Sequence, residues 1–357
     1  MTKIEKKKIA IVGAGIFGCT LALILSKKFD VYLFEKKNDI LNEASKMNQF
    51  RFHLGFHYPR SFKTINEIQH HYKDFLKFYG KDIYGQSKNY YSMAKYNSKT
   101  SFEKYLKILK KNKLFYKRIY KSDYVSDKIK GLILTDEKVL NYFKLKKKIY
   151  RLLKLKKIKL NLKKELQPKD IKSYYKIFLT TYKNNNSVLN NLGKKPKNFF
   201  RYELVEKLIV RLPNKYKKLS MVVLDGQFLC IDPYIGTKYH LLSHVKYSKI
   251  KIINSFFPNF SKKFSKLLSY EKLKNLKGTK FKKIIEDGSK YLPFLKKAKY
   301  ISSFYLVRTI MNNSKKDDDR TNQMDNFSNK IIAILSGKWN TSVTLSHKIL
   351  KILNKRK

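Results

Sequence analysis

The stretch KIAIVGAGIFGCTLALILSKKFDVYLFE, residues 8–35, decides the fold that this sequence predicts. It begins with a short apolar, β-branched run over 8–12, which is typical of a buried strand. An apolar helical run then extends to about Lys28, and a second strand over 30–34 ends at the acid Glu35. Three glycines separate the first strand from the helix at the G-x-G-x-x-G spacing: Gly13, Gly15 and Gly18. This order of strand, glycine turn, helix, strand and acid predicts a dinucleotide-binding unit.

Each glycine has its own physical role in such a unit. Gly13 permits the tight turn off the strand, Gly15 leaves room for a pyrophosphate to approach the backbone, and Gly18 lets the helix pack closely on the sheet. The first helical residues, Ile16 and Phe17, present unpaired backbone N–H groups and the positive end of the helix dipole. We therefore expect a pyrophosphate to bind at this turn.

The acid that ends the second strand completes the predicted site. Glu35 lies at roughly the 20-residue offset expected of the acid that binds ribose hydroxyls, and Lys36 follows it. Two other interpretations are open: the glycines serve helix packing alone, or basic 6–8 and the uncharged run 9–25 form a signal peptide or membrane anchor. That run is short for a membrane span, contains three glycines and lacks an A-x-A-like cleavage site, which favours dinucleotide binding.

Length and composition indicate a globular protein with a large core. The 357 residues are enough for two domains, and 43% of them are hydrophobic. The only two cysteines are Cys19 and Cys230, so a disulfide framework is not indicated and the sequence predicts a cytoplasmic protein. No other long apolar stretch follows the first one, so we expect no membrane span.

The net charge is the most unusual property of the composition. Lys and Arg number 81 against 26 Asp and Glu, which gives a formal net charge of +55. Such a charge favours acidic partners such as nucleic acid, anionic lipid or a phosphorylated substrate. Lys, Asn, Ile and Tyr are abundant together, however, as in proteins from AT-rich genomes, and the lysines are spread along the whole chain. We favour coding bias and predict no specific nucleic-acid partner.

The segment KKNDILNEASKMNQFRFHLGFHYPRSF, residues 36–62, differs from an ordinary connection between a strand and a helix. It is polar, and its second half concentrates side chains that bind ligands or transfer protons: Arg51, His53, His57, Tyr58 and Arg60. A long surface loop with structural histidines is one interpretation. The position directly after a nucleotide-binding unit favours a functional site instead.

This segment resembles the FAD-dependent oxidoreductases of the D-amino-acid oxidase superfamily. The resemblance rests on the pattern E-(x)9-S-(x)2-N, which starts at Glu35 and contains Ser45 and Asn48, followed by R-x-H-x-G-x-H-Y over 51–58. In that superfamily a Ser-containing segment crosses the pyrophosphate and leads to an H-x-G-x-x-Y-like stretch beside the flavin. The resemblance implies FAD as cofactor, with Ser45 and Asn48 among its contacts.

Two later segments continue the resemblance. Residues 173–182, SYYKIFLTTY, end like the A-T-G turn near the adenosine half of FAD, with Thr180 and Thr181 present and a tyrosine in place of the glycine. The strand predicted over 330–336 leads into a turn and helix that in the superfamily face the pyrimidine end of the flavin. The residues of that turn are Gly337, Lys338 and Trp339. An ordinary buried strand and a packing helix without flavin contact are the alternatives.

The sequence thus predicts an α/β fold, with an FAD-binding Rossmann-like domain on a parallel sheet and a mixed, mainly antiparallel substrate domain. Four strand-like runs support the substrate domain: 202–212, 219–224, 227–231 and 239–245. The pair Asp225-Gly226 predicts a hairpin turn between two of them. We expect the FAD-binding domain to comprise 1–75, 138–195 and 296–357. The substrate domain is then expected over 76–137 and 196–295.

The resemblance implies hydride transfer to flavin from a C–H beside an amine or hydroxyl. The expected substrate is small and anionic, an amino or hydroxy acid or a related sugar derivative. For a hydroxyl substrate, His57 or His53 is the expected general base. Arg308 is expected to bind the substrate carboxylate through two parallel donors, with Arg51 or Arg60 as alternates.

Three other functions are open at this point. A UDP-galactopyranose mutase shares the glycine turn and the acid, but 41–45 lacks the Gly-Gly pair expected about ten residues after that acid. An NAD-dependent dehydrogenase would leave 51–58 unexplained, and a non-enzymatic flavin-binding protein is the third possibility. The acids Asp317–Asp319 stand in a polar loop, which favours solvation over metal binding, so no metal site is predicted.

Overall fold

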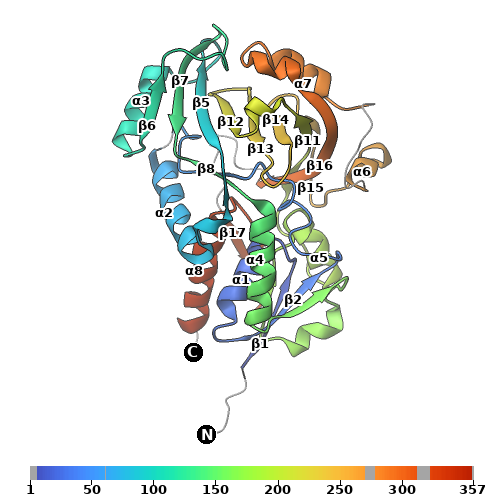
Figure 1. The fold of residues 1–357 in the computed structure, drawn as a ribbon. Coiled ribbons are helices and arrows are strands. Elements are labelled where there is room, and N and C mark those ends of the chain that lie inside the picture. Colours follow the sequence, from blue (N-terminus) through green and yellow to red (C-terminus); the bar gives the residue numbers. More distant parts are fainter. Residues whose placement is uncertain (1–5, 61, 270–277, 312–321, 356–357) are drawn as a thin grey trace.

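The fold has a lower and an upper part, each built on its own sheet (Figure 1). The structure, a computed structural model, describes residues 6–60, 62–269, 278–311 and 322–355. The lower sheet is mainly parallel and the upper, larger sheet is mainly antiparallel. The predicted α/β fold class is confirmed.

The lower sheet has the β1 strand near its centre. Its strands, in spatial order, are β17 (Gln323–Asn326), β18 (Ile331–Leu335), β10 (Lys176–Leu179), β1 (Lys8–Val12), β2 (Asp30–Glu35) and β9 (Lys159–Leu162). Neighbouring strands are parallel, except that β17 runs antiparallel to β18. The predicted strand–helix–strand unit at the N-terminus is therefore present and forms the middle of this sheet.

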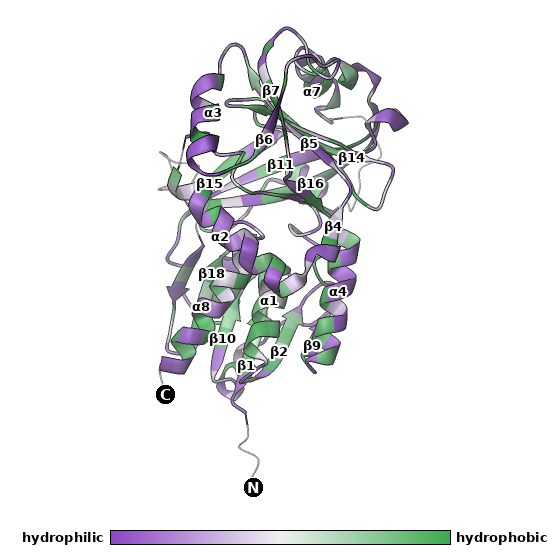
Figure 2. Cartoon of the chain, turned by 60° about the vertical axis from the view of Figure 1, so that its left-hand side comes forward, coloured by the Kyte–Doolittle hydropathy of each residue, from purple (hydrophilic) through white to green (hydrophobic). Residues whose placement is uncertain are grey.

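Both faces of this sheet are buried. Ile9 and Ile11 of β1 pack in one core cluster with α1, while Ala10 and Val12 pack in a second cluster on the other face. All four side chains are buried, as expected of a parallel sheet that is covered on both sides. Figure 2 shows β1 and its neighbouring helix in the colours of hydrophobic residues at the centre of the lower part.

Helices of the described residues cover the two faces of the lower sheet: α1 (Ile16–Leu25), α4 (Tyr142–Leu155), α5 (Asn185–Asn191) and α8 (Thr341–Lys355). Helix α1 packs against α8 and α4 on one face, whereas Leu189 of α5 belongs to the cluster on the other face. Helix α2 (Phe62–Tyr79) packs against α8. Helix α1 ends at Leu25, before the polar residues that were expected to form its last turn.

The upper sheet is built from strands that lie far apart in the sequence. Its order is β15 (Lys249–Ser255), β11 (Phe200–Arg211), β14 (His240–His244), β13 (Leu229–Pro233), β12 (Leu219–Leu224), β5 (Lys88–Ala94), β7 (Ile129–Thr135) and β6 (Tyr116–Ile119), and β16 (Lys299–Met311) also pairs with β11. All pairs are antiparallel except β12 with β5. The helices of this part are α3 (Phe102–Lys111), α6 (Lys262–Ser269) and α7 (Phe281–Gly288).

The fold also contains a small third sheet of three strands. It consists of β3 (Arg51–Phe52), β8 (Lys138–Leu140) and β4 (Tyr84–Gly85). Phe50 and Phe52 at β3 belong to the same core cluster as helix α1 and as Tyr234 and Phe304 of the upper part. This cluster joins the two parts across the segment that the sequence singles out.

One strand lies in a different sheet from the one predicted. Residues 296–357 were expected in the FAD-binding domain, but β16 pairs with β11 along almost its whole length and so belongs to the upper sheet. The reason is that β16 is a long strand whose inward residues, such as Val307, pack with Leu204 of β11. The other predicted domain boundaries stay a prediction. The predicted Asp225-Gly226 turn does connect the antiparallel strands β12 and β13.

Candidate active site

A cavity of about 1120 Å³ connects the glycine turn of the lower part with the strands of the upper part. Its wall comes from the β1–α1 turn, the segment after β2, the end of β10 and the strands β11, β12 and β16. Most of the predicted site residues line it: Gly13, Gly15, Ile16, Phe17, Glu35, Lys36, Ser45, Asn48, His53, His57, Thr180, Thr181, Arg308, Gly337 and Trp339. The fold therefore brings together residues from five distant stretches of the sequence.

The glycine turn is too tight for side chains at two of its three positions. Gly13 has a φ of +100°, and a Cβ there would lie 2.9 Å from the carbonyl oxygen of Thr180. A Cβ on Gly18 would lie 1.9 Å from the carbonyl oxygen of Gly13, so Gly18 acts in packing and is not part of the cavity wall. These contacts are those expected of the turn and the close helix packing in a dinucleotide-binding unit.

Gly15 differs from the other two glycines because it faces open space. A Cβ at Gly15 would meet only the Oγ of Ser45, at 3.4 Å. The same Ser45 Oγ accepts a hydrogen bond from the N–H of Ile16 at 3.1 Å. Helix α1 has no acidic side chain in its first turn and no side-chain cap on Gly15, so this end is suited to an anion. The turn fits a pyrophosphate crossing between Gly15 and Ser45.

Glu35 is fixed at the rim of the cavity by backbone donors. Its Oε2 accepts a hydrogen bond from the N–H of Ala14, and its Oε1 accepts one from the N–H of Lys37, both at 2.9 Å. An ionised carboxylate has about four acceptor sites, so each oxygen keeps a lone pair for a ribose hydroxyl. The position of Glu35 beside the glycine turn fits the role predicted for it.

The hydroxyl groups of the two threonines after β10 form hydrogen bonds within the protein and do not point at the cavity. The Oγ1 of Thr180 donates to the carbonyl oxygens of Val12 and Gly13, at 3.0 and 2.8 Å. The Oγ1 of Thr181 donates to Asn185 Oδ1 at 2.8 Å. Tyr182, which stands where the resembled family has glycine, adopts a φ of +57°. The backbone thus keeps the left-handed conformation that normally favours glycine.

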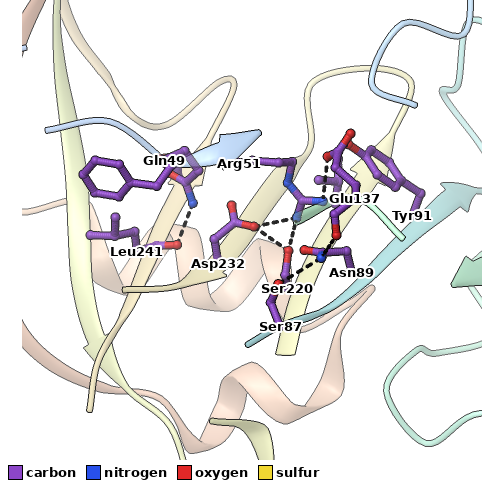
Figure 3. A network of polar contacts seen from close by, with 12 residues as sticks. Gln49, Arg51, Ser87, Asn89, Tyr91, Glu137, Ser220, Asp232 and Leu241 are labelled. Atoms are coloured by element: carbon purple, nitrogen blue, oxygen red, sulfur yellow. Dashed lines mark hydrogen bonds and ion pairs between the residues drawn. The ribbon is translucent and has the colours of Figure 1, made fainter. Parts of the chain in front are cut away.

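A buried charge cluster lies behind the segment that was expected beside the flavin (Figure 3). The guanidinium of Arg51 is 2.6 Å from Asp232 Oδ1 and donates to Ser220 Oγ, also at 2.6 Å. Its Nη1 lies 3.6 Å from Oε1 of Glu137. Arg51, Glu137 and Asp232 have side chains at most 2% exposed. Arg51 is therefore engaged in a structural cluster, which makes it a poor ligand for a substrate carboxylate.

The two predicted histidines lie next to each other on the cavity wall. The ring centroids of His53 and His57 are 5.2 Å apart. His53 is partly exposed, and its Nδ1 lies 3.7 Å from Oε1 of Glu137. Burial acts to raise the pKa of the Glu137 carboxyl, but His53, Arg51 and Tyr91 together hold that pKa below its ordinary value. The site therefore contains an ionised buried carboxylate beside an imidazole.

The predicted substrate arginine is already oriented by an acid. Both Nε and Nη2 of Arg308 contact Oε2 of Glu203, with Nε at 3.1 Å. Arg201 approaches the other oxygen of Glu203 at 3.4 Å, so two guanidiniums share one carboxylate on the cavity wall. Arg60, an alternate in the sequence argument, pairs with Asp225 Oδ2 at 3.0 Å. These pairs fix the arginines while leaving a net positive charge around Glu203.

The C-terminal turn reaches the cavity through two of its three predicted residues. The N–H of Gly337 donates to Asn322 Oδ1 at 2.8 Å, and Trp339 packs edge-on against Phe50. Lys338 is not part of the cavity wall, and its Nζ lies 3.8 Å from the ring centroid of Tyr58. A cationic amine over an aromatic face is a favourable contact, which ties the C-terminal turn to the histidine segment.

The N-terminal part of the chain, less than half of its length, matches a known family. A sequence profile described as FAD dependent oxidoreductase covers residues 8–156, which include the glycine turn, Glu35 and both histidines. Over these residues the chain matches the family that the sequence was found to resemble, and the predicted resemblance and its FAD dependence are confirmed for this stretch.

Solved structures share the fold of this chain along nearly its whole length. Glycine oxidase from Geobacillus kaustophilus superposes with a TM-score of 0.67 at 11% identity, over 98% of this chain and 95% of that one. The FAD-bound L-alpha-glycerophosphate oxidase from Mycoplasma pneumoniae gives a TM-score of 0.67 at 15% identity, with the same coverage. At these identities the likeness shows the fold alone.

A curated relative with higher identity matches only a short region. The FAD-dependent monooxygenase FPY4 from Fusarium mangiferae is 39% identical over 85 residues, which are 22% of this chain and 23% of that protein. The match thus spans about a quarter of the relative's length. The similarity supports the family and leaves the reaction of the whole chain to be proposed.

Sequence reasoning missed the acids that hold the site together. Glu137, Asp232, Glu203 and Asp225 each pair with an arginine or histidine that the sequence did single out. Their only sequence signal was weak, because each stands in or beside a predicted strand and pairs with a residue far away in the chain. Within the described ranges, no group of three His, Cys, Asp or Glu side chains could hold a metal ion.

The expectations about membrane spans and metal binding concern the whole chain, and the structure bears on them only in its described residues. No helix within it is long and apolar enough to cross a bilayer. Asp317–Asp319 lie outside the described residues.

Proposed function

We propose that the chain oxidises a small, anionic amino or hydroxy acid with FAD. The observation that carries this proposal is the single cavity that runs from the glycine turn to the histidine pair and Arg308. At about 1120 Å³ it exceeds the ~300–1,000 Å³ of an ordinary ligand pocket, which suits a dinucleotide together with a small substrate. When bound, FAD supplies the acceptor for the hydride that leaves the substrate.

The residues of the lower part would hold the cofactor. The open side of Gly15 and the first turn of α1 would receive the pyrophosphate, with Ser45 on its other side. Glu35 would accept hydrogen bonds from the ribose through the lone pairs that Ala14 and Lys37 leave over. Gly337 and Trp339 would border the flavin end of the cavity.

The residues of the upper part would bind and deprotonate the substrate. Arg308, fixed by Glu203 and accompanied by Arg201, would attract the carboxylate or phosphate of the substrate. His53 or His57 would take the proton from a hydroxyl, whereas an amine could react as its free base without a protein base. The names of the two structural neighbours, glycine oxidase and glycerophosphate oxidase, agree with a small anionic substrate.

The visible spectrum of the purified protein tests this proposal. We expect flavin absorbance that bleaches under anaerobic conditions when the right amino acid, hydroxy acid or sugar phosphate is added. A colourless protein that binds nicotinamide nucleotides instead would refute it. Turnover of a nucleotide sugar only after prior reduction would point to the mutase, an alternative that the family match does not support.

A further inference from the structure

Glu137 contacts the histidine segment from a fully buried position. It stands in the loop between β7 and β8, and its side chain is 0% exposed. Its Oε2 accepts a hydrogen bond from the backbone N–H of Leu54 at 2.8 Å, and its Oε1 accepts one from the hydroxyl of Tyr91 at 2.6 Å. Oε1 also lies 3.7 Å from Nδ1 of His53. One carboxylate therefore binds the backbone next to His53 and places a negative charge beside one edge of its ring, beyond hydrogen-bond distance.

The two nitrogens of His53 have different surroundings. Nδ1 is buried against Glu137, while 24% of the His53 side chain is exposed on the cavity wall. Nε2 is then the nitrogen left for a substrate. An Nδ1–H that faces a carboxylate leaves Nε2 unprotonated and able to accept a proton, as in other carboxylate–histidine pairs.

The buried cluster behind His53 carries an uncompensated charge. Arg51 carries one positive charge, whereas Glu137 and Asp232 carry one negative charge each, so the buried cluster has one negative charge in excess. The rings of His57 and Tyr58 lie beside His53, and Lys338 lies above Tyr58. Tyr91 packs near His57 and donates to Glu137. Burial raises the pKa of Tyr91 well above its usual value, so that phenol is neutral. An imidazolium at His53 would compensate the excess charge.

We propose that Glu137 is a positioning residue that makes His53, rather than His57, the proton acceptor of this enzyme. The inference rests on the proposed function for a hydroxyl substrate. In that reaction the hydroxyl proton passes to Nε2 of His53, the hydride leaves the adjacent carbon for the oxidant FAD, and a carbonyl forms. Glu137 touches neither the substrate nor the reacting atoms; it favours the tautomer in which Nε2 of His53 can accept the proton.

The first test needs no substrate. NMR of the FAD-loaded protein with labelled histidines, with the His53 signal assigned from its loss in H53N, compares Glu137→Gln with Asp232→Asn. Both variants remove one negative charge beside Arg51, but only Glu137 contacts His53. We expect Glu137→Gln to reduce the Nδ1–H tautomer of His53, read from its ring-nitrogen shifts, and Asp232→Asn to leave that tautomer unchanged. Equal changes in both variants would overturn the positioning role.

The second test separates the two histidines kinetically. With a hydroxyl substrate, His53→Asn should slow flavin reduction by about 10²–10⁴, the usual worth of a general base, and His57→Asn by less than about tenfold. A larger loss in His57→Asn would overturn the assignment. Both rings line the cavity, so these variants can be made even if Glu137→Gln fails to fold. If no substrate reduces the wild-type flavin, the proposed function fails, and the NMR comparison still decides the role of Glu137.

Discussion

At one end of the cavity, the glycine turn combines close backbone packing with hydrogen bonds to side chains 21 and 29 residues away, whereas at the other end Arg51 is held by side chains from much more distant segments. The turn is fixed by hydrogen bonds from Ala14 to Glu35 and from Ile16 to Ser45. Arg51 depends on Ser220 and Asp232, which lie 169 and 181 residues further along the chain. The first arrangement depends mainly on tight packing around the glycines, and the second depends on charges brought together from distant segments.

The two regions are expected to tolerate different kinds of substitution. A steric turn fails when volume is added, because its backbone groups are already in contact. A buried charge cluster fails when one partner is removed, because the remaining charges stay in a low-dielectric interior without compensation. Substitutions that add volume in the lower part and remove charge in the upper part therefore test this comparison most directly.

The largest effect is expected at Gly18, with Gly15 as its matched control. Gly18→Val should prevent folding or cost more than about 3 kcal/mol, because its Cβ would lie 1.9 Å from the carbonyl oxygen of Gly13. Gly15→Val should fold, because a Cβ there meets only Ser45 Oγ at 3.4 Å, but should lose the yellow colour of bound FAD. Thermal unfolding and visible spectra of both variants measure these outcomes. A Gly15→Val protein with full flavin content would show that the turn does not contact the cofactor.

The next largest effect is expected at Arg51. Arg51→Met should lower the free energy of unfolding by about 3–5 kcal/mol, because Asp232 and Glu137 would stay buried without their shared cation. Urea denaturation of the purified protein measures this loss. The double variant Arg51→Met/Asp232→Asn should recover part of the stability. A single variant as stable as the wild type would contradict the electrostatic description of the upper region.

His240 of β14 should make the stability of the upper part depend on pH. Burial lowers the pKa of this histidine to about 4, and the ordinary unfolded value is about 6.5. The unfolded state therefore binds more protons between these values, so the stabilisation is complete above about pH 6.5 and is lost as the pH falls toward 4. The loss amounts to roughly 3 kcal/mol. Urea unfolding at pH 7, 5 and 4 should show a shallower dependence in His240→Asn, and an unchanged slope would exclude this residue as the cause.

The smallest effect is expected at Arg308, where charge is kept and geometry is changed. Arg308→Lys retains one positive charge beside Glu203 but loses the second parallel donor. We expect FAD to stay bound and the KM for an anionic substrate to rise about tenfold, with a smaller change in kcat. Steady-state kinetics with the substrate found by anaerobic bleaching measures both constants. A variant with reduced kcat and normal KM would place Arg308 in the chemical step instead of in binding.

The nucleotide-binding half of the site could be predicted from the sequence because its determinants are local. Gly13, Gly15, Gly18 and Glu35 lie within one stretch of 28 residues, and their spacing follows from the geometry of one strand, one turn and one helix. The segment that follows it, 36–62, led to the resemblance to a flavin-dependent family, and the family match covers both stretches. Thr180 was also predicted at the cavity, but its hydroxyl binds backbone carbonyls of the glycine turn, which only the pairing of β10 with β1 could show.

The tertiary structure alone decided the partners of the charged side chains. The sequence singled out Arg51, His53 and Arg308 by residue type, but the acids that face them, Glu137 and Glu203, carry no pattern of their own. The placement of β16 in the upper sheet was missed for the same reason. Pairing between strands and charges far apart in the chain depends on how the sheets assemble, whereas a glycine turn depends on backbone geometry that a few neighbouring residues determine.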